Sequence, residues 1–218
     1  MSSESPNSVV DTVVLRYFLL VGRVDLLVSL LGAPLGIPRI VFDPDEGDVP
    51  DAARSEITKS VSYQQRVAVD PARDTTEQGD ASRKAAQLAG VAEMHQADLL
   101  VILDMTDAEL RIASQLVSPS GCKAFGLSFP LGAGEAACIA IGTTRDLVVA
   151  TDDADALRAL PTIAPTHPYE RIRKLLMRSA EIHMISKVDA NQLHAEMQRL
   201  GFWDTISPFP KPKTKGQA

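Results

Sequence analysis

The sequence predicts an α/β domain of three layers, in which helices cover both faces of a mostly parallel central sheet. Short apolar runs such as Leu99–Leu103 are typical of strands that are buried on both faces. These runs alternate with segments whose apolar residues recur three and four positions apart, as in amphipathic helices. The 218 residues are enough for one large domain with a well-formed core.

The first half of the domain begins with a short buried strand at Ser8–Asp11. Two helices follow at 13–20 and 24–31, each with apolar residues at helical spacing. Regular structure is then predicted to break at four glycines and prolines, Gly32, Pro34, Gly36 and Pro38. The acidic stretch 43–51 predicts a loop, and its proline suits the first turn of a helix at 51–61.

The second half repeats the alternation of helices and strands. Its predicted elements are an exposed connection at 71–80, helices at 81–97, 107–116 and 135–142, and strands at 99–103 and 147–150. Two amphipathic helices lie between 168 and 200 and separate near 185–188. We therefore expect one domain over 8–207 with a C-terminal helix pair, between disordered ends at 1–7 and 208–218.

Composition limits the classes of function. The net charge of −6 argues against a protein that grips nucleic acid over its whole surface, although it allows a local basic rim. Cys122 and Cys138 have no CxxC partner, so they are expected to be reduced core residues. The chain has neither an apolar run of ~20 residues nor the start of a signal peptide. The sequence therefore predicts a cytoplasmic protein without a membrane segment.

Acidic residues stand where apolar runs stop or helices begin. Asp11 and the pair Asp152 and Asp153 close predicted strands, and Glu135 follows Gly-Ala-Gly at a helix start. Open α/β sheets place their ligands at the carboxyl ends of their strands, so these acids could form one site. Each is equally suited to capping a helix or complementing its dipole. Glu56 alone would be a solvated helix residue.

Four motifs in order make the chain resemble PIN-domain ribonucleases, which include the VapC-like toxins of toxin–antitoxin pairs. They are Val-Val-Asp-Thr at 9–12, the Val-Pro helix start at 49–57, Leu-Gly-Ala-Gly-Glu at 131–135 and the strand end Val-Val-Ala-Thr-Asp-Asp at 148–153. The resemblance extends from about residue 8 to residue 160, and the C-terminal helix pair resembles that of a subgroup.

The resemblance implies a metal-dependent endoribonuclease that hydrolyses RNA. It implies the catalytic acids Asp11, Glu56, Glu135 and Asp153. It also implies Mg²⁺ or Mn²⁺ held by Asp11, Glu135, Asp153 and Asp152, directly or through water. Thr12 and Thr151 would donate hydrogen bonds to the acids or cap helices.

Two departures from the family pattern leave parts of this site open. The stretch 40–80 is long and acidic, so Asp43, Asp45 and Glu46 compete with Glu56 for the second acid. The strand-end pair is followed by Ala-Asp-Ala instead of further polar family residues. Asp152 and Asp153 are neighbours and cannot face the same way, so one is expected to be a ligand and the other a cap.

Basic side chains are candidates for contact with an RNA backbone. They are Arg16, beside the first motif, and Arg171, Lys174 and Arg178, which share one face of a C-terminal helix. The same residues suit an ordinary solvated helix face. No aromatic ladder for stacking bases is evident, because Phe202, Trp203 and Phe209 cluster near the end of the chain.

Partners and alternatives follow from the resemblance. A toxin would have a small antitoxin that masks the acids, and family members often pair, which implies a homodimer. A non-catalytic PIN-fold interaction or regulatory module is the main alternative. A phosphatase of the haloacid dehalogenase class fits least well, because Asp11 lacks the Asp-x-Asp arrangement.

Overall fold

A computed structural model of the protein describes residues 5–47 and 49–210. Five parallel strands form one sheet in the order β3-β2-β1-β4-β5. Their bounds are β1 Ser8–Val10, β2 Leu35–Pro38, β3 Leu100–Leu103, β4 Val148–Ala150 and β5 Tyr169–Glu170. The predicted α/β class is confirmed, and β1, which carries Asp11 at its end, is the central strand.

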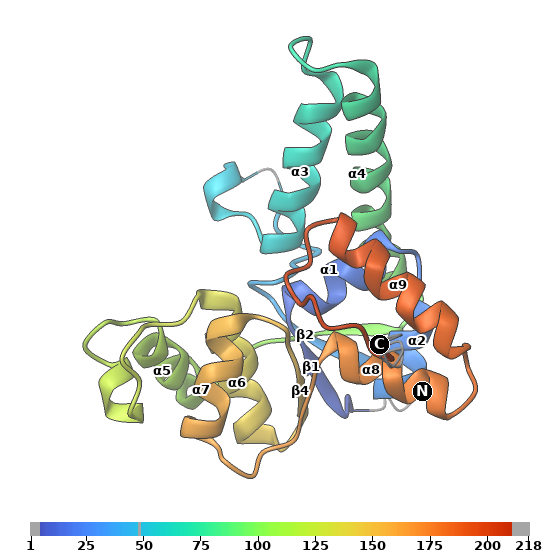
Figure 1. The fold of residues 1–218 in the computed structure, drawn as a ribbon. Helices are drawn as coiled ribbons and strands as arrows, with labels where there is room; N and C mark the ends of the chain where they lie inside the picture. The colour runs from blue at the N-terminus through green and yellow to red at the C-terminus, as the bar shows by residue number, and fades with distance from the viewer. Residues whose placement is uncertain (1–4, 48, 211–218) are drawn as a thin grey trace, which may run out of the picture.

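Helices cover the sheet on both faces (Figure 1). One face carries α1 (Thr12–Leu20), α2 (Val24–Leu31) and α8 (Ile172–Glu181). The other carries α5 (Asp107–Leu116), α6 (Ala133–Arg145) and α7 (Ala154–Ile163). Along β1, Val9 belongs to the core on the second face and Val10 to the core on the first. Because successive strand side chains point to opposite faces, an uninterrupted apolar run is what such a strand requires.

The predicted break at 32–38 is wrong, because β2 lies there between β1 and β3. A Cβ on Gly36 would lie 2.5 Å from Leu103 Cδ1 and 2.7 Å from the Ser8 carbonyl oxygen. The glycine therefore allows three strands to approach closely, and Pro38 stands at the strand end, where no further ladder bond is needed. The two-residue strand β5, next to β4, was also missed.

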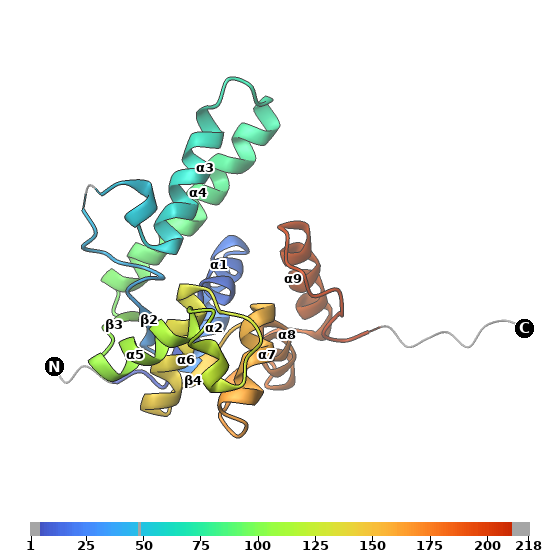
Figure 2. The same ribbon diagram turned by 90° about the vertical axis from the view of Figure 1, so that its left-hand side faces the viewer.

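The region after β2 differs most from its prediction. The predicted helix 51–61 is a 3₁₀ turn at Asp51–Ala53 followed by α3 at Glu56–Val69. The predicted connection 71–80 is shorter, since α4 runs from Thr75 to Gln96. Asp74 caps α4 by accepting hydrogen bonds from two of its first backbone N–H groups. Together α3 and α4 form a hairpin that projects from the body of the molecule (Figures 1 and 2).

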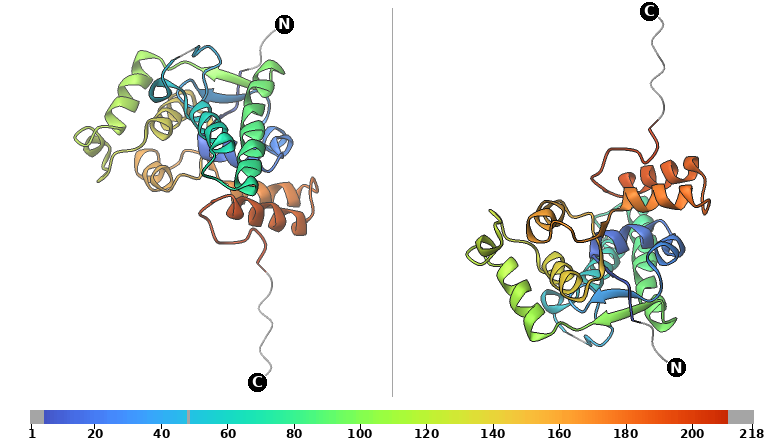
Figure 3. Two further views of the ribbon diagram at one scale, coloured as in Figure 1. Left: turned by 90° about the horizontal axis from the view of Figure 1, so that it is seen from above. Right: turned by 90° about the horizontal axis from the view of Figure 1, so that it is seen from below.

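Helices α1, α2, α5 and α6 match their predictions to within a few residues, whereas α7 was not predicted. The predicted C-terminal pair consists of α8 and α9, the latter spanning Lys187–Arg199, and they pack on one another. Viewed from above and below, α9 and α5 lie at opposite ends of the body (Figure 3). Among the described residues, no helix combines the length and apolar character needed to cross a membrane.

The predicted disordered ends fall partly outside the described residues, at 1–4 and 211–218. Inside them, the Asn7 carbonyl accepts a hydrogen bond from Val148 N at 3.0 Å. Phe209 exchanges two hydrogen bonds with the side chain of Asn191, at 2.7 and 2.9 Å. Asn7 and Phe209 are therefore hydrogen-bonded to β4 and α9.

Candidate acidic site

Asp11 lies at the carboxyl end of the central strand and is fully buried. Its backbone N–H donates to the Ala150 carbonyl at 2.9 Å, which continues the pairing of β1 with β4. Although Asp11 precedes α1, its side chain makes no capping hydrogen bond. Instead, the Thr151 hydroxyl donates to Asp11 Oδ2 at 2.9 Å, and Oδ1 has no partner. The capping explanation for this acid is therefore excluded.

Glu135 reaches the same region from the first turn of α6. Its half-buried carboxylate has one buried oxygen, Oε2, without a hydrogen-bond partner. A Cβ on Gly132 would lie 2.1 Å from that oxygen, so the glycine leaves the space that the carboxylate occupies. Burial raises the pKa of Glu135, and repulsion from Asp153 and Glu56 raises it further.

Glu56 joins the cluster as the first residue of α3. The Thr12 hydroxyl donates a hydrogen bond to Glu56 Oε2. A Cβ on Gly134 would lie 2.7 Å from Glu56 Oε1, so a glycine is needed where this carboxylate meets α6. The motif Gly-Ala-Gly-Glu thus supplies one acid and makes room for two.

The competing acids of the 40–47 region are engaged elsewhere. Asp43 and Asp45 lie 2.6 and 3.6 Å from the guanidinium of Arg39. Glu46 accepts a hydrogen bond from the backbone N–H of Ser55 at 2.6 Å. Of the acids that compete for the second position, Glu56 is therefore the one that the structure brings to Asp11.

Burial and like charge act together on Asp11. The pKa of this carboxyl is raised from its ordinary value of 3.8 to about 8. Burial is the largest cause, and repulsion from Glu135 and then Glu56 contributes to the rise. The Thr151 hydroxyl partly offsets the rise, because it stabilises the charged form. A cation placed beside these acids would remove the repulsion and favour the ionised carboxylates.

Asp152 and Asp153 face different ways. Asp153 caps α7, accepting from Asp155 N at 2.7 Å and Ala156 N at 3.0 Å, and its charge acts on Glu135. Asp152 is fully buried and pairs with Arg171 Nε at 2.9 Å, while also accepting from Ile172 N. The structure thus brings Asp153 to the rim of the cluster and leaves Asp152 outside it.

Three of the four predicted RNA-binding cations pair with acids of the chain. Arg171 bonds to Asp152 and Asp204, while Lys174 and Arg178 lie 3.3 and 3.7 Å from Glu170. The Arg16 guanidinium lies 5.9 Å from the Tyr17 ring centroid, and its buried Nε has no hydrogen-bond partner. The face of α8 is therefore a partly neutralised surface instead of an open basic stripe.

Two residues near the acids were not predicted. Burial raises the pKa of the Cys138 thiol well above its ordinary value, and Asp11, Glu56 and Glu135 raise it further. Its position three residues after Glu135 places both on one helix face, which was a usable signal. Trp203 donates from Nε1 to the Asp152 carbonyl at 2.6 Å, although it lies 51 residues further along the chain. No local signal could have found that contact.

The donors suit a hard cation, although the arrangement is loose. Two unpartnered buried oxygens, Asp11 Oδ1 and Glu135 Oε2, are ligands that Mg²⁺ and Mn²⁺ prefer. Within residues 5–47 and 49–210, no three acidic, histidine or cysteine side chains are grouped closely enough to hold an ion by themselves. An ion held by these two oxygens would have to complete its coordination with water. A cavity of about 710 Å³ lies elsewhere, between β5, α8 and the segment 206–210.

No protein-family model, curated protein or solved structure matches this chain. The fold and the site still define a class. It is an α/β protein with a five-stranded parallel sheet and a cluster of carboxylates at the carboxyl end of its central strands.

Proposed function

We propose that the protein is a metal-dependent endoribonuclease of the PIN-domain type, which hydrolyses RNA phosphodiester bonds with Mg²⁺ or Mn²⁺. The observation that carries the proposal is the Asp11 carboxylate, buried beside Glu135 and Glu56 with one oxygen unpartnered. Keeping such acids together is costly unless a cation neutralises them. Three of the four motifs that resemble the PIN family lie on the expected elements and support it, and the Val-Pro motif ends at Glu56, the first residue of α3.

The chain's own residues have distinct roles in this proposal. Asp11 and Glu135 would hold the ion through their free oxygens, and Thr151 orients Asp11 by its hydrogen bond. Glu56, fixed by Thr12, would hold a water molecule on the side facing α3. Asp153 adds negative charge at the rim from its position as the cap of α7. The bound ion would supply Lewis acidity, which activates water and neutralises charge on the phosphate.

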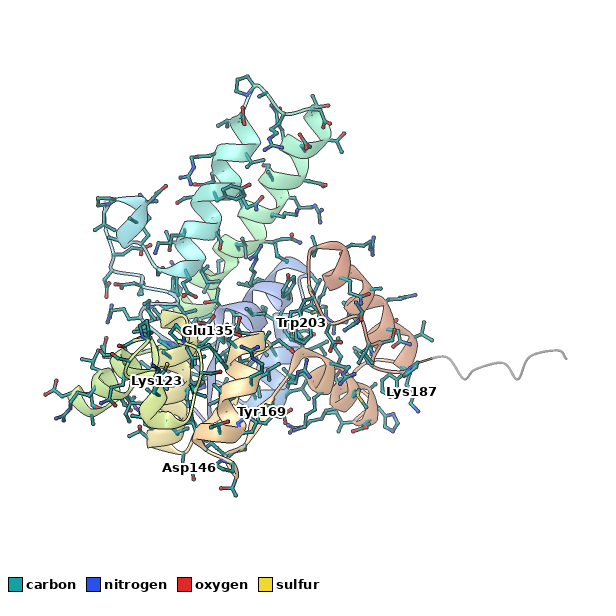
Figure 4. The ribbon with its side chains drawn as sticks, turned by 60° about the vertical axis from the view of Figure 1, so that its left-hand side comes forward. Lys123, Glu135, Asp146, Tyr169, Lys187 and Trp203 are labelled. Atoms are coloured by element: carbon teal, nitrogen blue, oxygen red, sulfur yellow. The ribbon has the colours of Figure 1, made fainter. Side chains whose placement is uncertain are left out.

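The decisive experiment compares RNA cleavage by the natural protein with that by two variants. Asp11→Asn removes the charge of the central acid and should abolish cleavage in both Mg²⁺ and Mn²⁺. Asp146→Asn is the matched control, because Asp146 is exposed and lies on the opposite side of the body from Glu135 (Figure 4). Asparagine also tolerates its left-handed backbone, φ 57°. Equal cleavage by all three proteins would refute the proposal.

The toxin proposal adds a protein partner. An antitoxin would block the site by placing an arginine against Asp11 and Glu135. A guanidinium can donate two parallel hydrogen bonds to a carboxylate. Such a partner would compete with Mn²⁺ for the same oxygens. Loss of binding in the presence of saturating Mn²⁺ would test this, with Asp146→Asn again as the control.

A non-catalytic interaction module is the second candidate. It is favoured by the absence, in the described part of the chain, of any close group of three potential ligands. It is also favoured by the internal pairing of Arg171, Lys174 and Arg178. On this alternative neither metal-linked stabilisation nor cleavage would be observed, and the acids would serve a protein partner instead.

A further inference from the structure

Trp203 is anchored to the segment that follows β4. Its indole N–H donates to the carbonyl oxygen of Asp152 at 2.6 Å, and the next residue, Asp153, is the one whose charge acts on Glu135. In Figure 4, Trp203 and Glu135 both lie on the side of the body from which the α3–α4 hairpin rises, whereas Asp146 lies on the opposite side. The ring is therefore placed at the carboxyl end of the sheet.

The ring is held firmly and yet exposed. The Arg171 guanidinium lies 5.4 Å from the ring centroid, and the Phe202 ring lies 6.2 Å away. Arg171 is itself fixed by Asp152 and Asp204. Despite these contacts, Trp203 remains 50% exposed. An aromatic surface that is fixed before binding loses little conformational entropy when a ligand covers it.

We propose that Trp203 is a stacking platform for an unpaired base of the RNA strand whose phosphodiester lies at Asp11 and Glu135. The inference rests on the proposed ribonuclease function and narrows its substrate class to single-stranded or looped RNA. A base can cover an exposed ring only when it is out of a duplex stack. The Arg171 guanidinium over one face of the ring holds the ring by a cation–π attraction, so a base would stack on the other face. Stacking accepts every base, so little sequence preference is expected at this position.

Tyr63 is an exposed aromatic side chain comparable to Trp203, but it lies in a different part of the fold. Tyr63 is 54% exposed and lies on α3, two turns from Glu56. Within the described residues, no hydrogen bond joins Tyr63 to the strands that lead to the acids, whereas Trp203 bonds to Asp152, two residues beyond β4. Tyr63→Ala is therefore a matched control for the loss of an exposed aromatic ring.

The chain contains a single tryptophan, so its fluorescence reports on this ring alone. The probe is a short single-stranded oligouridylate, added in Ca²⁺ to limit cleavage, with uridine monophosphate at equal nucleotide concentration as the absorbance control. We expect the oligouridylate to quench the fluorescence, and a blunt RNA duplex of the same length to leave it unchanged. In parallel, anisotropy of labelled oligouridylate should show an affinity roughly 5- to 150-fold weaker for Trp203→Ala. Trp203→Phe should retain most of the affinity, and Tyr63→Ala all of it.

The outcomes separate this inference from the function on which it rests. Cleavage of RNA with unchanged tryptophan fluorescence would overturn the platform and leave the nuclease standing. Quenching of the fluorescence without any cleavage of RNA would support the platform and count against the nuclease function. Equal losses of affinity for Trp203→Ala and Tyr63→Ala, or quenching by duplex as strong as by single strand, would also overturn the platform. If Trp203→Ala fails to fold, the quenching assay and Trp203→Phe still decide the question.

Discussion

The most direct test of the acidic site is at Asp11. A charge on this buried carboxyl should lower the free energy of unfolding, and a substitution that cannot ionise should avoid that loss. The pKa of Asp11 is raised from 3.8 to about 8 in the folded protein. Stability that depends on a protonated Asp11 is therefore complete below about pH 4 and is lost as the pH rises towards about 8. Asp11→Asn keeps the shape of the side chain and cannot ionise, so its variant should not suffer this loss.

The magnitude follows from the width of that window. Between about pH 5 and about pH 8, three pH units at about 1.4 kcal/mol each give an upper limit of about 4 kcal/mol. Water entry and relaxation around the charge reduce the figure, so a difference of a few kcal/mol is expected. The natural protein should lose this much more free energy of unfolding than Asp11→Asn over the same pH range.

The assay is urea unfolding at both pH values in chelator, for the natural protein, Asp11→Asn and Asp146→Asn. The control variant should follow the natural protein, because Asp146 is exposed. Saturating Mn²⁺ should then restore the natural protein at the higher pH by mass action, about 2.7 kcal/mol at one hundred times the dissociation constant, and leave Asp11→Asn unchanged. Parallel pH profiles for the natural protein and Asp11→Asn would refute the reasoning.

Three further substitutions test close contacts at the acids, at the Arg171 ion pair and within the sheet. Gly134→Ala places a Cβ 2.7 Å from Glu56 Oε1 and should weaken Mn²⁺-linked stabilisation, so an unchanged metal titration would contradict the role of this glycine. Arg171→Leu leaves Asp152 buried without its ion-pair partner, so urea unfolding should show a free energy of unfolding lower by about 3–5 kcal/mol. A decrease below about 1 kcal/mol would count against a buried ion pair. Gly36→Ala meets a backbone oxygen at 2.7 Å and should lower the free energy of unfolding by roughly 1–3 kcal/mol, and a melting temperature equal to that of the natural protein would show that β2 can shift.

Local signals were enough to predict the elements that carry the two central acids. The apolar run before Asp11 has to be buried on both faces, and the glycines before Glu135 mark a helix start with room around it. The break predicted at 32–38 failed for a different reason. Gly36 and Pro38 are turn formers in isolation, and only the close approach of Leu103 and Ser8 makes a glycine necessary in a strand.

The orientation of the acid pair after β4 depended on residues far away in the sequence. Strand geometry requires Asp152 and Asp153 to diverge, but it does not say which one faces the site. Arg171 and the backbone N–H of Ile172 decide it, because they bind the Asp152 carboxylate on the side of α8. These contacts span about twenty residues, which no motif of the strand end could reveal.

Asp152 contacts Arg171, Ile172 and Trp203 instead of the other acids. Its carboxylate holds Arg171 and its carbonyl accepts the Trp203 indole N–H, while the following residue, Asp153, faces Glu135. The C-terminal segment is thus bonded to the strand end on which the acid cluster is built. Arg171 also contacts Asp204, which lies after α9. A substitution in that segment would therefore act on Asp153 through Arg171 and Asp152. The segments that flank the C-terminal helices therefore hold the strand end from which Asp153 extends, although they contribute no acid to the cluster.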